Sequence, residues 1–411
     1  MKVAIAGAGI GGLCAALMLH ARGIEVEIWE SAAEIRPLGS GLMLMPQAVH
    51  ELMELGLGNQ LATLGVDIAA MCYFNRYGQQ IWRDPRGHAA AANAPQYAIN
   101  RGLLQVLLHN VTTDRLGAQA VHCGKAFESF EPEERGVLVR LRDPRTRTLT
   151  ESRVDVLIGA DGIFSAVRSF MYPIKDELRF SGRMIWRALA ESEPLLDGRS
   201  AFMAGTRRQK FSCFPVSGSL HTRGRALLSW VAELQTGGAV PPKAEWNRRV
   251  DKALILRAFA DWKWDWLDVP GLIESSREIL EFPIVDRDPL PRWSFGPVTL
   301  LGDAAHPIYP TGHAGAAQAI LDARYLADCL QSCSDPCEAL REYEAERIPD
   351  TTALLLRHRM NGPEQVLQLA EARAPDGFNG SVQGIEEAEL RRATQRFKEV
   401  AGINPERHMP N

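Results

Sequence analysis

The sequence is poor in cysteine. Its seven cysteines are odd in number and scattered over 411 residues, which is typical of reduced thiols in the cytoplasm rather than of a disulfide framework. Three of them recur at every fourth position, at Cys329, Cys333 and Cys337. Pro336 interrupts any shared helix face there and no histidine lies nearby in the sequence, so we expect no metal site. The absence of a Cys-x-x-Cys pair argues against disulfide chemistry.

Long apolar runs and an excess of basic charge are also missing. The one stretch that resembles a signal peptide, residues 3–19, is broken by glycines between positions 7 and 12, and no small-residue cleavage signal follows it. No other segment approaches the roughly 18 uninterrupted apolar residues of a membrane span, so we expect no membrane partner. The formal net charge of −4 gives no reason to expect nucleic acid as a partner. The chain is long enough for two or three packed units.

A glycine motif follows the first predicted strand, residues 2–6, and opens a predicted helix. In this Gly-x-Gly-x-x-Gly turn, Gly7 makes the tight turn, Gly9 lets the backbone approach a pyrophosphate, and Gly12 lets helix and strand pack closely. Glu30, at the end of the next predicted strand, is placed to accept hydrogen bonds from a ribose diol. The motif predicts dinucleotide binding, but it does not separate NAD from FAD.

Two later motifs resemble those of a known family. Residues 155–162, Asp-Val-Leu-Ile-Gly-Ala-Asp-Gly, resemble the Asp-Gly motif of the class A (single-component) FAD-dependent monooxygenases, and residues 300–307, Leu-Leu-Gly-Asp-Ala-Ala-His-Pro, resemble their Gly-Asp motif. The order and spacing of the three motifs also match. More narrowly, the chain resembles the phenazine hydroxylase branch of that family, and the segments that carry this likeness are residues 35–39, 84–87, 95–97, 186–187, 285–291 and 318–322. More distantly, it is similar to salicylate and para-hydroxybenzoate hydroxylases.

The resemblance implies an α/β fold in which a Rossmann-like FAD-binding domain is interrupted by a β-sheet substrate domain and followed by a C-terminal helical segment. The sequence agrees, because residues 180–285 are rich in Trp, Phe and Arg with β-like runs, and the α/β pattern returns at about residue 298. The expected domains are a discontinuous FAD-binding domain (1–70, 100–175 and 284–360), a substrate-binding sheet domain (71–99 and 176–283) and a polar, peripheral helical tail (361–411).

The resemblance also implies non-covalent FAD, with NADH or NADPH as a transient reductant. Asp303 would contact the ribityl or pyrophosphate region, and Arg101, at the start of a helix, would neutralise a phosphate. Asp161 and Arg168 would lie on the cleft that the nicotinamide visits, with a surface ion pair as the alternative for Arg168. The full set of expected cofactor residues is Gly7, Gly9, Gly12, Glu30, Arg36, Gly41, Leu42, Arg101, Asp161, Arg168, Gly302, Asp303, Gly312, Gly315 and Ala316.

The loop over residues 310–315 departs from the phenazine hydroxylase branch. Relatives carry Gly-Ser-Asn-Gly-Ala-Ser where this chain has Gly-His-Ala-Gly-Ala-Ala, so two polar side chains are lost and one imidazole, that of His313, is gained. The loop would present backbone N–H groups to the flavin and stabilise its anionic reduced form. We hypothesise that His313 faces the active-site cavity, together with Tyr309 and Pro310, and contacts substrate or flavin. The alternative is that it points to solvent.

Apolar and aromatic residues are candidates for the walls of the substrate cavity, although each also suits the core. The candidates are Met43, Met45, Trp186, Phe214 and Trp230. Arg187 is the best nearby candidate for binding a substrate carboxylate, because guanidinium groups bind carboxylates bidentately; an interdomain ion pair is the alternative. His306, between Ala305 and Pro307, is interpreted as structural. Arg287 either holds a domain boundary or belongs to the site.

In the family that the chain resembles, NAD(P)H reduces the flavin, oxygen adds at flavin C4a, and the hydroperoxide hydroxylates an electron-rich ring. The expected substrate is an aromatic or N-heteroaromatic compound, carrying a carboxylate in our interpretation, and the protein is a monomer or a homodimer. No second Gly-x-Gly-x-x-Gly motif is present, which argues against disulfide reductases and Baeyer–Villiger enzymes. Two alternatives stay open: an FAD-dependent dehydrogenase that uses no oxygen, and a non-catalytic flavin-binding redox sensor.

Overall fold

The N-terminal motif folds into a β-α-β unit at the centre of a parallel sheet. The computed structural model describes residues 1–173, 177–242, 246–360, 364–378 and 385–400, with side chains to residue 395. The sheet has the order β21-β12-β1-β2-β8 and all its pairings are parallel. Its strands are β1 (Lys2–Ala6), β2 (Glu25–Glu30), β8 (Val121–Cys123), β12 (Val156–Gly159) and β21 (Val298–Leu300). Because parallel strands end at one edge, the segments after β1, β12 and β21 meet there.

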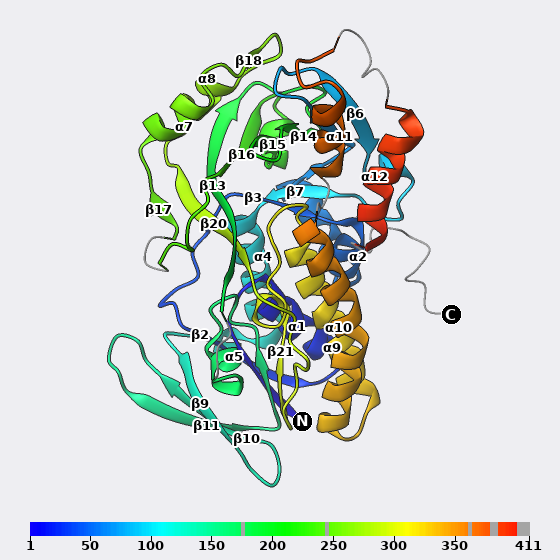
Figure 1. The fold of residues 1–411 in the computed structure, drawn as a ribbon. Coiled ribbons are helices and arrows are strands. Elements are labelled where there is room, and N and C mark those ends of the chain that lie inside the picture. Colours follow the sequence, from blue (N-terminus) through cyan, green and yellow to red (C-terminus); the bar gives the residue numbers. More distant parts are fainter. Residues whose placement is uncertain (174–176, 243–245, 361–363, 379–384, 401–411) are drawn as a thin grey trace.

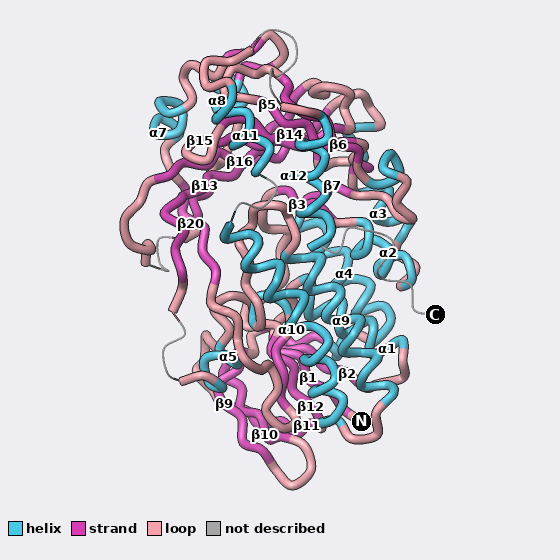
Figure 2. The backbone as a smooth tube through the Cα atoms, turned by 45° about the vertical axis from the view of Figure 1, so that its right-hand side comes forward, coloured by secondary structure: helices cyan, strands magenta, loops and turns pink. Residues whose placement is uncertain are grey.

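Four helices pack beside this sheet in the lower half of the molecule (Figures 1 and 2). They are α1 (Ile10–Ala21), α4 (Arg101–Leu116), α9 (Gly315–Ser332) and α10 (Pro336–Met360). The start of α4 is fixed by Asn100, whose side chain accepts hydrogen bonds from the backbone N–H groups of Gly102 (3.0 Å) and Leu103 (3.1 Å). This cap holds Arg101 at the first turn of the helix.

A second, larger sheet occupies the upper half of the molecule (Figure 1), in the order β17-β20-β13-β16-β15-β14-β5-β6. Its pairings are antiparallel except that of β5 with β14. Its strands are β5 (Ala70–Phe74), β6 (Gln80–Pro85), β13 (Arg179–Ser192), β14 (Ser200–Gly205), β15 (Gln209–Pro215), β16 (Ala226–Gln235), β17 (Arg248–Arg249) and β20 (Leu280–Asp286). One face of this sheet is covered by α7 (Lys252–Ala258) and α8 (Val269–Ser275), and the other faces the parallel-sheet half.

Smaller elements join the two halves. A three-stranded sheet lies between them, and a three-stranded meander extends from the parallel sheet. The small sheet consists of β3 (Gly41–Leu44), β7 (Tyr97–Asn100) and β4 (Val66–Asp67), and the meander of β9 (Ala126–Pro132), β10 (Val137–Arg142) and β11 (Leu149–Val154). The remaining short elements are β18 (Lys263–Trp264), β19 (Leu267–Asp268), α2 (Pro46–Glu54), α3 (Gly58–Leu64), α5 (Ala166–Met171) and α6 (Gly218–His221). None of the described helices is long and apolar enough to cross a membrane.

The C-terminal helices α11 (Gln365–Arg373) and α12 (Glu387–Val400) are packed, not peripheral. Val366, Leu367 and Ala370 on α11 are buried in a cluster with residues of β5 and β14. Leu390 and Ala393 on α12 join the same cluster. The expectation of a peripheral tail was wrong for these helices, because their few apolar residues recur at helical spacing and form one buried face.

Candidate active site

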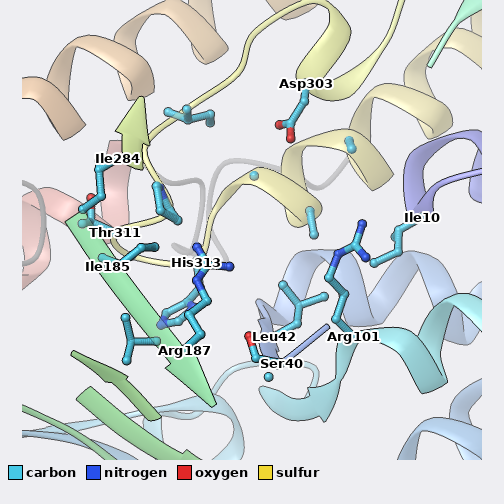
Figure 3. A pocket seen from close by; sticks show the side chains of 18 of the residues that line it. Ile10, Ser40, Leu42, Arg101, Ile185, Arg187, Ile284, Asp303, Thr311 and His313 are labelled. Atoms are coloured by element: carbon cyan, nitrogen blue, oxygen red, sulfur yellow. The ribbon is translucent and has the colours of Figure 1, made fainter. Parts of the chain in front are cut away.

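A cavity of about 300 Å³ lies between the two halves of the molecule. Its walls come from the Gly7–Gly12 turn, the segment before β3, the loop after β21, the loop before α9 and the inward face of the large sheet (Figure 3). Twelve of the residues expected at the site line it: Gly9, Gly41, Leu42, Arg101, Arg187, Gly302, Asp303, Pro310, Gly312, His313, Gly315 and Ala316. The fold therefore brings together segments that lie up to about 300 residues apart in the sequence.

The three motif glycines have different surroundings. A Cβ added to Gly12 would lie 2.1 Å from the carbonyl oxygen of Gly7, and one added to Gly7 would lie 2.5 Å from that of Ala160. Gly7 also has a φ of +109°, which side chains rarely adopt. An added Cβ at Gly9 would meet no atom within 4 Å, because Gly9 lines the open cavity. Gly7 and Gly12 thus permit the fold, while Gly9 leaves space for a ligand.

This difference predicts that two alanine substitutions act on different properties, one on FAD binding and the other on the stability of the fold. We expect Gly9→Ala to leave the stability of the cofactor-free protein nearly unchanged but to raise the dissociation constant of FAD by about tenfold or more, since the methyl group enters the space of the pyrophosphate. Gly12→Ala should lower the free energy of unfolding before any cofactor binds. Urea unfolding of the cofactor-free proteins and fluorescence titration with FAD separate the two effects. Equal losses of stability in both variants would contradict the assignment.

Glu30 sits beside the glycine turn. One of its carboxylate oxygens accepts a hydrogen bond from the N–H of Ala8 (2.9 Å), and the other accepts one from the N–H of Ala32 (2.8 Å). The carboxylate therefore lies at the carboxyl end of β2, where a ribose diol of a dinucleotide would reach it. Arg36, in contrast, is exposed, pairs with Glu34 and does not line the cavity.

Arg101 and Asp303 bring opposite charges to the cavity (Figure 3). Burial among protein atoms lowers the pKa of Arg101, and Asp303 opposes this shift. Burial likewise raises the pKa of Asp303, while His306 and Arg101 act against the rise. A guanidinium suits a phosphate and a carboxylate suits ribityl hydroxyls, so this pair fits the two polar parts of FAD.

The two residues predicted on the nicotinamide cleft, Asp161 and Arg168, make hydrogen bonds within the protein. The Arg168 guanidinium is 1% exposed and donates hydrogen bonds to the carbonyl oxygens of Ala304 (3.1 Å) and Ala305 (2.9 Å). Arg168 does not line the cavity, so its place on the nicotinamide cleft stays a prediction. Asp161 accepts hydrogen bonds from Ser165 and from backbone N–H groups at the start of α5, and only its neighbours Ala160 and Gly162 line the cavity.

A buried network supports the loop that carries Asp303. Asp322 on α9 is fully buried and accepts hydrogen bonds from the Gly302 N–H (3.0 Å) and from Arg347 (2.9 Å). Nε2 of His306 lies 2.5 Å from its carboxylate. The interpretation of His306 as structural agrees with this contact. The sequence reasoning missed Asp322 and Arg347 as positioning residues, although an acidic residue on the apolar side of a helix was a usable signal. Arg287 donates to the carbonyl oxygen of Ile163 (3.2 Å) and does not line the cavity.

The two tryptophans predicted as cavity walls belong to the core on the far side of the large sheet. Neighbouring residues of a strand point to opposite faces. Ile185 and Arg187 on β13 line the cavity, while Trp186 between them is 2% exposed in the opposite core. Trp230 on β16 lies in the same core, next to the cavity-lining Val231. The prediction was wrong because in each strand the residue next to the tryptophan, Arg187 or Val231, lines the cavity, and adjacent residues of a strand point to opposite faces of the sheet.

The three other wall candidates, and Tyr309, which was expected to face the cavity beside His313, lie behind the cavity rather than on it. Met43 and Phe214 share one buried cluster, Met45 belongs to the core beside α2, and Tyr309 packs with Ile185 and Ile284. Phe214 backs the wall, because its ring would be 2.5 Å from a Cβ added to Gly41. The predictions that Met43, Met45 and Phe214 form cavity walls and that Tyr309 faces the cavity were therefore wrong. The residues that do form the sheet side, and that the sequence reasoning missed, are Ile185, Met203, Lys210, Ser212, Val231, Glu233 and Ile284.

Arg187 is a positive charge with no acidic partner in the part of the chain that the structure describes. Its side chain lies in the cavity wall beside His313 (Figure 3), with the guanidinium 5.0 Å from the centre of the Phe282 ring. Its Nε is buried and has no hydrogen-bond partner among the described residues. Burial lowers the pKa of Arg187 to about 10, and Arg101 adds to the shift. The group stays protonated at neutral pH, so the cavity holds a cation that an anionic ligand can neutralise.

His313 lines the cavity from the loop before α9. Its backbone φ is +59°, a left-handed conformation that is uncommon for residues other than glycine. The imidazole meets the Phe214 ring edge to face, with centroids 5.2 Å apart. Burial, together with the neighbouring charges of Arg187, Arg86 and His358, lowers the pKa of His313 to about 4. The imidazole is therefore neutral in the working range of pH.

The lowered pKa makes His313 a source of acid sensitivity. The folded-state pKa lies below the ordinary value of 6.5, so the unfolded chain binds a proton first and stability falls as the pH drops from about 6.5 to about 4. Relative to His313→Gln, we expect the wild type to lose about 1 kcal/mol more between pH 7.5 and pH 5, allowing for partial exposure. Urea unfolding of both proteins measures this. Parallel losses in both proteins would show that His313 is not buried as a neutral group.

The glycine turn, the Glu30 carboxylate and the Arg101–Asp303 pair fit a dinucleotide cofactor such as FAD, bound beside a cavity under a β-sheet. A family model described as FAD binding domain matches residues 1–357. The chain is 44% identical over 378 residues to the phenazine 1,6-dicarboxylic acid hydroxylase of Lysobacter antibioticus, covering 91% of this chain and 92% of that protein. It is 31% identical to the 3-amino-4-hydroxybenzoate 2-monooxygenase of Streptomyces cremeus, with 89% of each chain covered.

Among solved structures, the chain is similar to that of Klebsiella pneumoniae HpxO complexed with FAD and uric acid. The TM-score is 0.74 at 26% identity, and the likeness covers 98% of this chain and 93% of that one. The chain belongs to the FAD binding domain family, and within it to the FAD-dependent aromatic hydroxylases. The family and the fold class predicted from the three motifs are confirmed.

Proposed function

We propose that this enzyme hydroxylates a carboxylated aromatic or N-heteroaromatic compound with NAD(P)H and O₂, and that Arg187 binds the carboxylate. The observation that carries the proposal is the half-buried Arg187 side chain in the cavity wall, whose Nε is buried and which has no carboxylate partner among the described residues. A buried cation without a counter-charge is costly to the folded protein. An anionic substrate offsets this cost, whereas a neutral one does not.

In this proposal FAD lies with its adenosine end at Gly9 and Glu30, its phosphates near Arg101, and its ribityl chain near Asp303. The bound flavin supplies the redox chemistry and the activation of oxygen. The chain's own part is to position the substrate ring and keep water out. The apolar residues Ile185, Val231 and Ile284 line the sheet side of the cavity and exclude water. His313, neutral and beside Arg187, donates or accepts a hydrogen bond without adding charge.

The named substrates of two sequence relatives support a carboxylated ring. The Lysobacter relative is named for a phenazine dicarboxylic acid and the Streptomyces relative for an amino-hydroxybenzoate. We propose further that the enzyme acts in the cytoplasm as a monomer or homodimer. The seven cysteines, all free, suit a reducing compartment.

The test is NAD(P)H consumption by the purified FAD-loaded protein, with peroxide release recorded, across benzoate, pyridine, quinoline and phenazine acids bearing hydroxyl or amino groups. We expect at least one acid to accelerate consumption with little peroxide, and mass spectrometry under ¹⁸O₂ to find one labelled oxygen in its product. The carboxamides of the same rings should not accelerate NAD(P)H consumption. Product formation without label would instead establish a dehydrogenase.

A further inference from the structure

Four charged side chains form a closed cluster at the edge of the cavity. They are Arg183 on β13, Lys210 on β15, Glu233 on β16 and Glu364 just before α11. Arg183 contacts Glu233 (2.6 Å) and Glu364 (3.3 Å). Lys210 contacts Glu233 (3.0 Å) and also donates to Glu364. Each cation meets both carboxylates, so the formal charges of this cluster, called here the Lys210 cluster, cancel.

Lys210 has one donor left over. Its ammonium group carries three N–H donors. Glu364 accepts one of them and Glu233 is an ion-pair partner at 3.0 Å, and the described residues offer no further partner. Lys210 is 2% exposed and lines the cavity. Since an unpaired buried donor is costly, a hydrogen-bond acceptor on a ligand in the cavity would stabilise the third N–H.

The pairing of the strands fixes where this donor lies relative to Arg187. Arg187 and Ser212 both pair with Val231, from either side of β16. Lys210 pairs with Glu233, two residues further along that strand. Two strand spacings across and two residues along correspond to a Cα–Cα separation of ~12 Å. Val231 and Ser212, which line the cavity, form the floor between the two cations.

We propose that Arg187 and Lys210 are the two poles of the substrate site: Arg187 binds the carboxylate, and Lys210 donates a hydrogen bond to a neutral acceptor on the far side of the ring system. This inference rests on the proposed function and specifies its substrate class. The charges decide which pole takes which group. Within the described ranges no carboxylate pairs with Arg187, so it attracts an anion, whereas the Lys210 cluster is neutral overall and offers a donor without net attraction. An aromatic ring nitrogen or a ring carbonyl fits this second pole.

The test compares two acids of the same shape, phenazine-1-carboxylate and anthracene-1-carboxylate, which differ in the ring nitrogens. Each is titrated into the FAD-loaded protein and binding is followed by flavin absorbance, with no turnover required. We expect the wild type to prefer the phenazine acid over the anthracene acid. The ratio of the two affinities, phenazine over anthracene, should be about five- to tenfold larger in the wild type than in the double variant Lys210→Met/Glu364→Gln. This double variant removes one charge of each sign and so keeps the cluster neutral. The affinity for the anthracene acid should stay within about twofold.

A second variant tests the charge assignment and keeps Lys210. Glu364→Gln leaves the cluster with a net positive charge, which attracts a second carboxylate. The ratio of the affinity for phenazine-1,6-dicarboxylate to that for phenazine-1-carboxylate should therefore be at least about fivefold higher in this variant than in the wild type. An unchanged ratio of phenazine to anthracene affinity in the double variant overturns the role of Lys210 while leaving the proposed function intact. Failure of the wild type to bind either acid counts against the proposed function itself, and with it this inference.

Discussion

Replacing Arg187 by methionine should make the protein more stable and nearly unable to bind its substrate. In the wild type, burial lowers the pKa of Arg187 to about 10, which means that the folded protein holds this charge at a cost. Removing it should raise the free energy of unfolding of the substrate-free protein by about 1–2 kcal/mol, allowing for water in the cavity. The dissociation constant of a carboxylated substrate should rise by about a hundredfold or more, because a desolvated charge pair is lost.

Controls make the Arg187 prediction specific. Arg179 lies on the same strand, but its guanidinium is mostly exposed and pairs with Asp288 at 3.2 Å. Arg179→Met should change substrate affinity by less than about threefold. The carboxamide analogue of the substrate should bind the wild type and Arg187→Met about equally, since it has no charge to pair. If Arg187→Met binds acid and amide as the wild type does, Arg187 has no role in recognition.

The cofactor side of the site could be predicted from the sequence because its signals are local. Gly9 lies between a strand and a helix that can be recognised from their own residues, and Asp303 follows a strand in the same way. Each element of a β-α-β unit places its ends at one edge of the sheet, whatever lies elsewhere in the chain. For this reason Gly9 and Asp303, which belong to two distant motifs, line one cavity.

The substrate side could not be predicted because it depends on strand register and distant pairing. Trp186 and Arg187 are adjacent in the sequence, and only the pairing of β13 with β16 decides that Arg187 faces the cavity. A shift of one residue exchanges the two faces. Glu364 is further out of reach, because its partner Lys210 is 154 residues away and belongs to a different element. A polar C-terminal segment carries no local sign that it contributes to a buried charge cluster.

Replacing Asp322 by asparagine should lower the free energy of unfolding by about 3–5 kcal/mol, because Arg347 and His306 lose their buried partner. FAD should also bind more weakly, since the Gly302 N–H that precedes Asp303 loses a charged acceptor. Although burial alone would raise the pKa of Asp322, His306 and Arg347 hold it below its ordinary value of 3.8. The carboxylate therefore stabilises the fold throughout pH 5–8 and loses this effect only as the pH falls below about 3.8.

Asp328 provides the matched control for Asp322 on the same helix. It pairs with Arg22 and Arg324, but its side chain is 43% exposed. Exposed ion pairs contribute little, so Asp328→Asn should cost less than about 1 kcal/mol. Urea unfolding at pH 7 and pH 5, with FAD titration of each variant, distinguishes the two aspartates. Equal, small losses would mean that the loop carrying Asp303 is held by its backbone contacts alone. A large loss of unfolding free energy that is confined to Asp322→Asn and equal at both pH values would show that the Asp322 carboxylate holds the loop that carries Asp303.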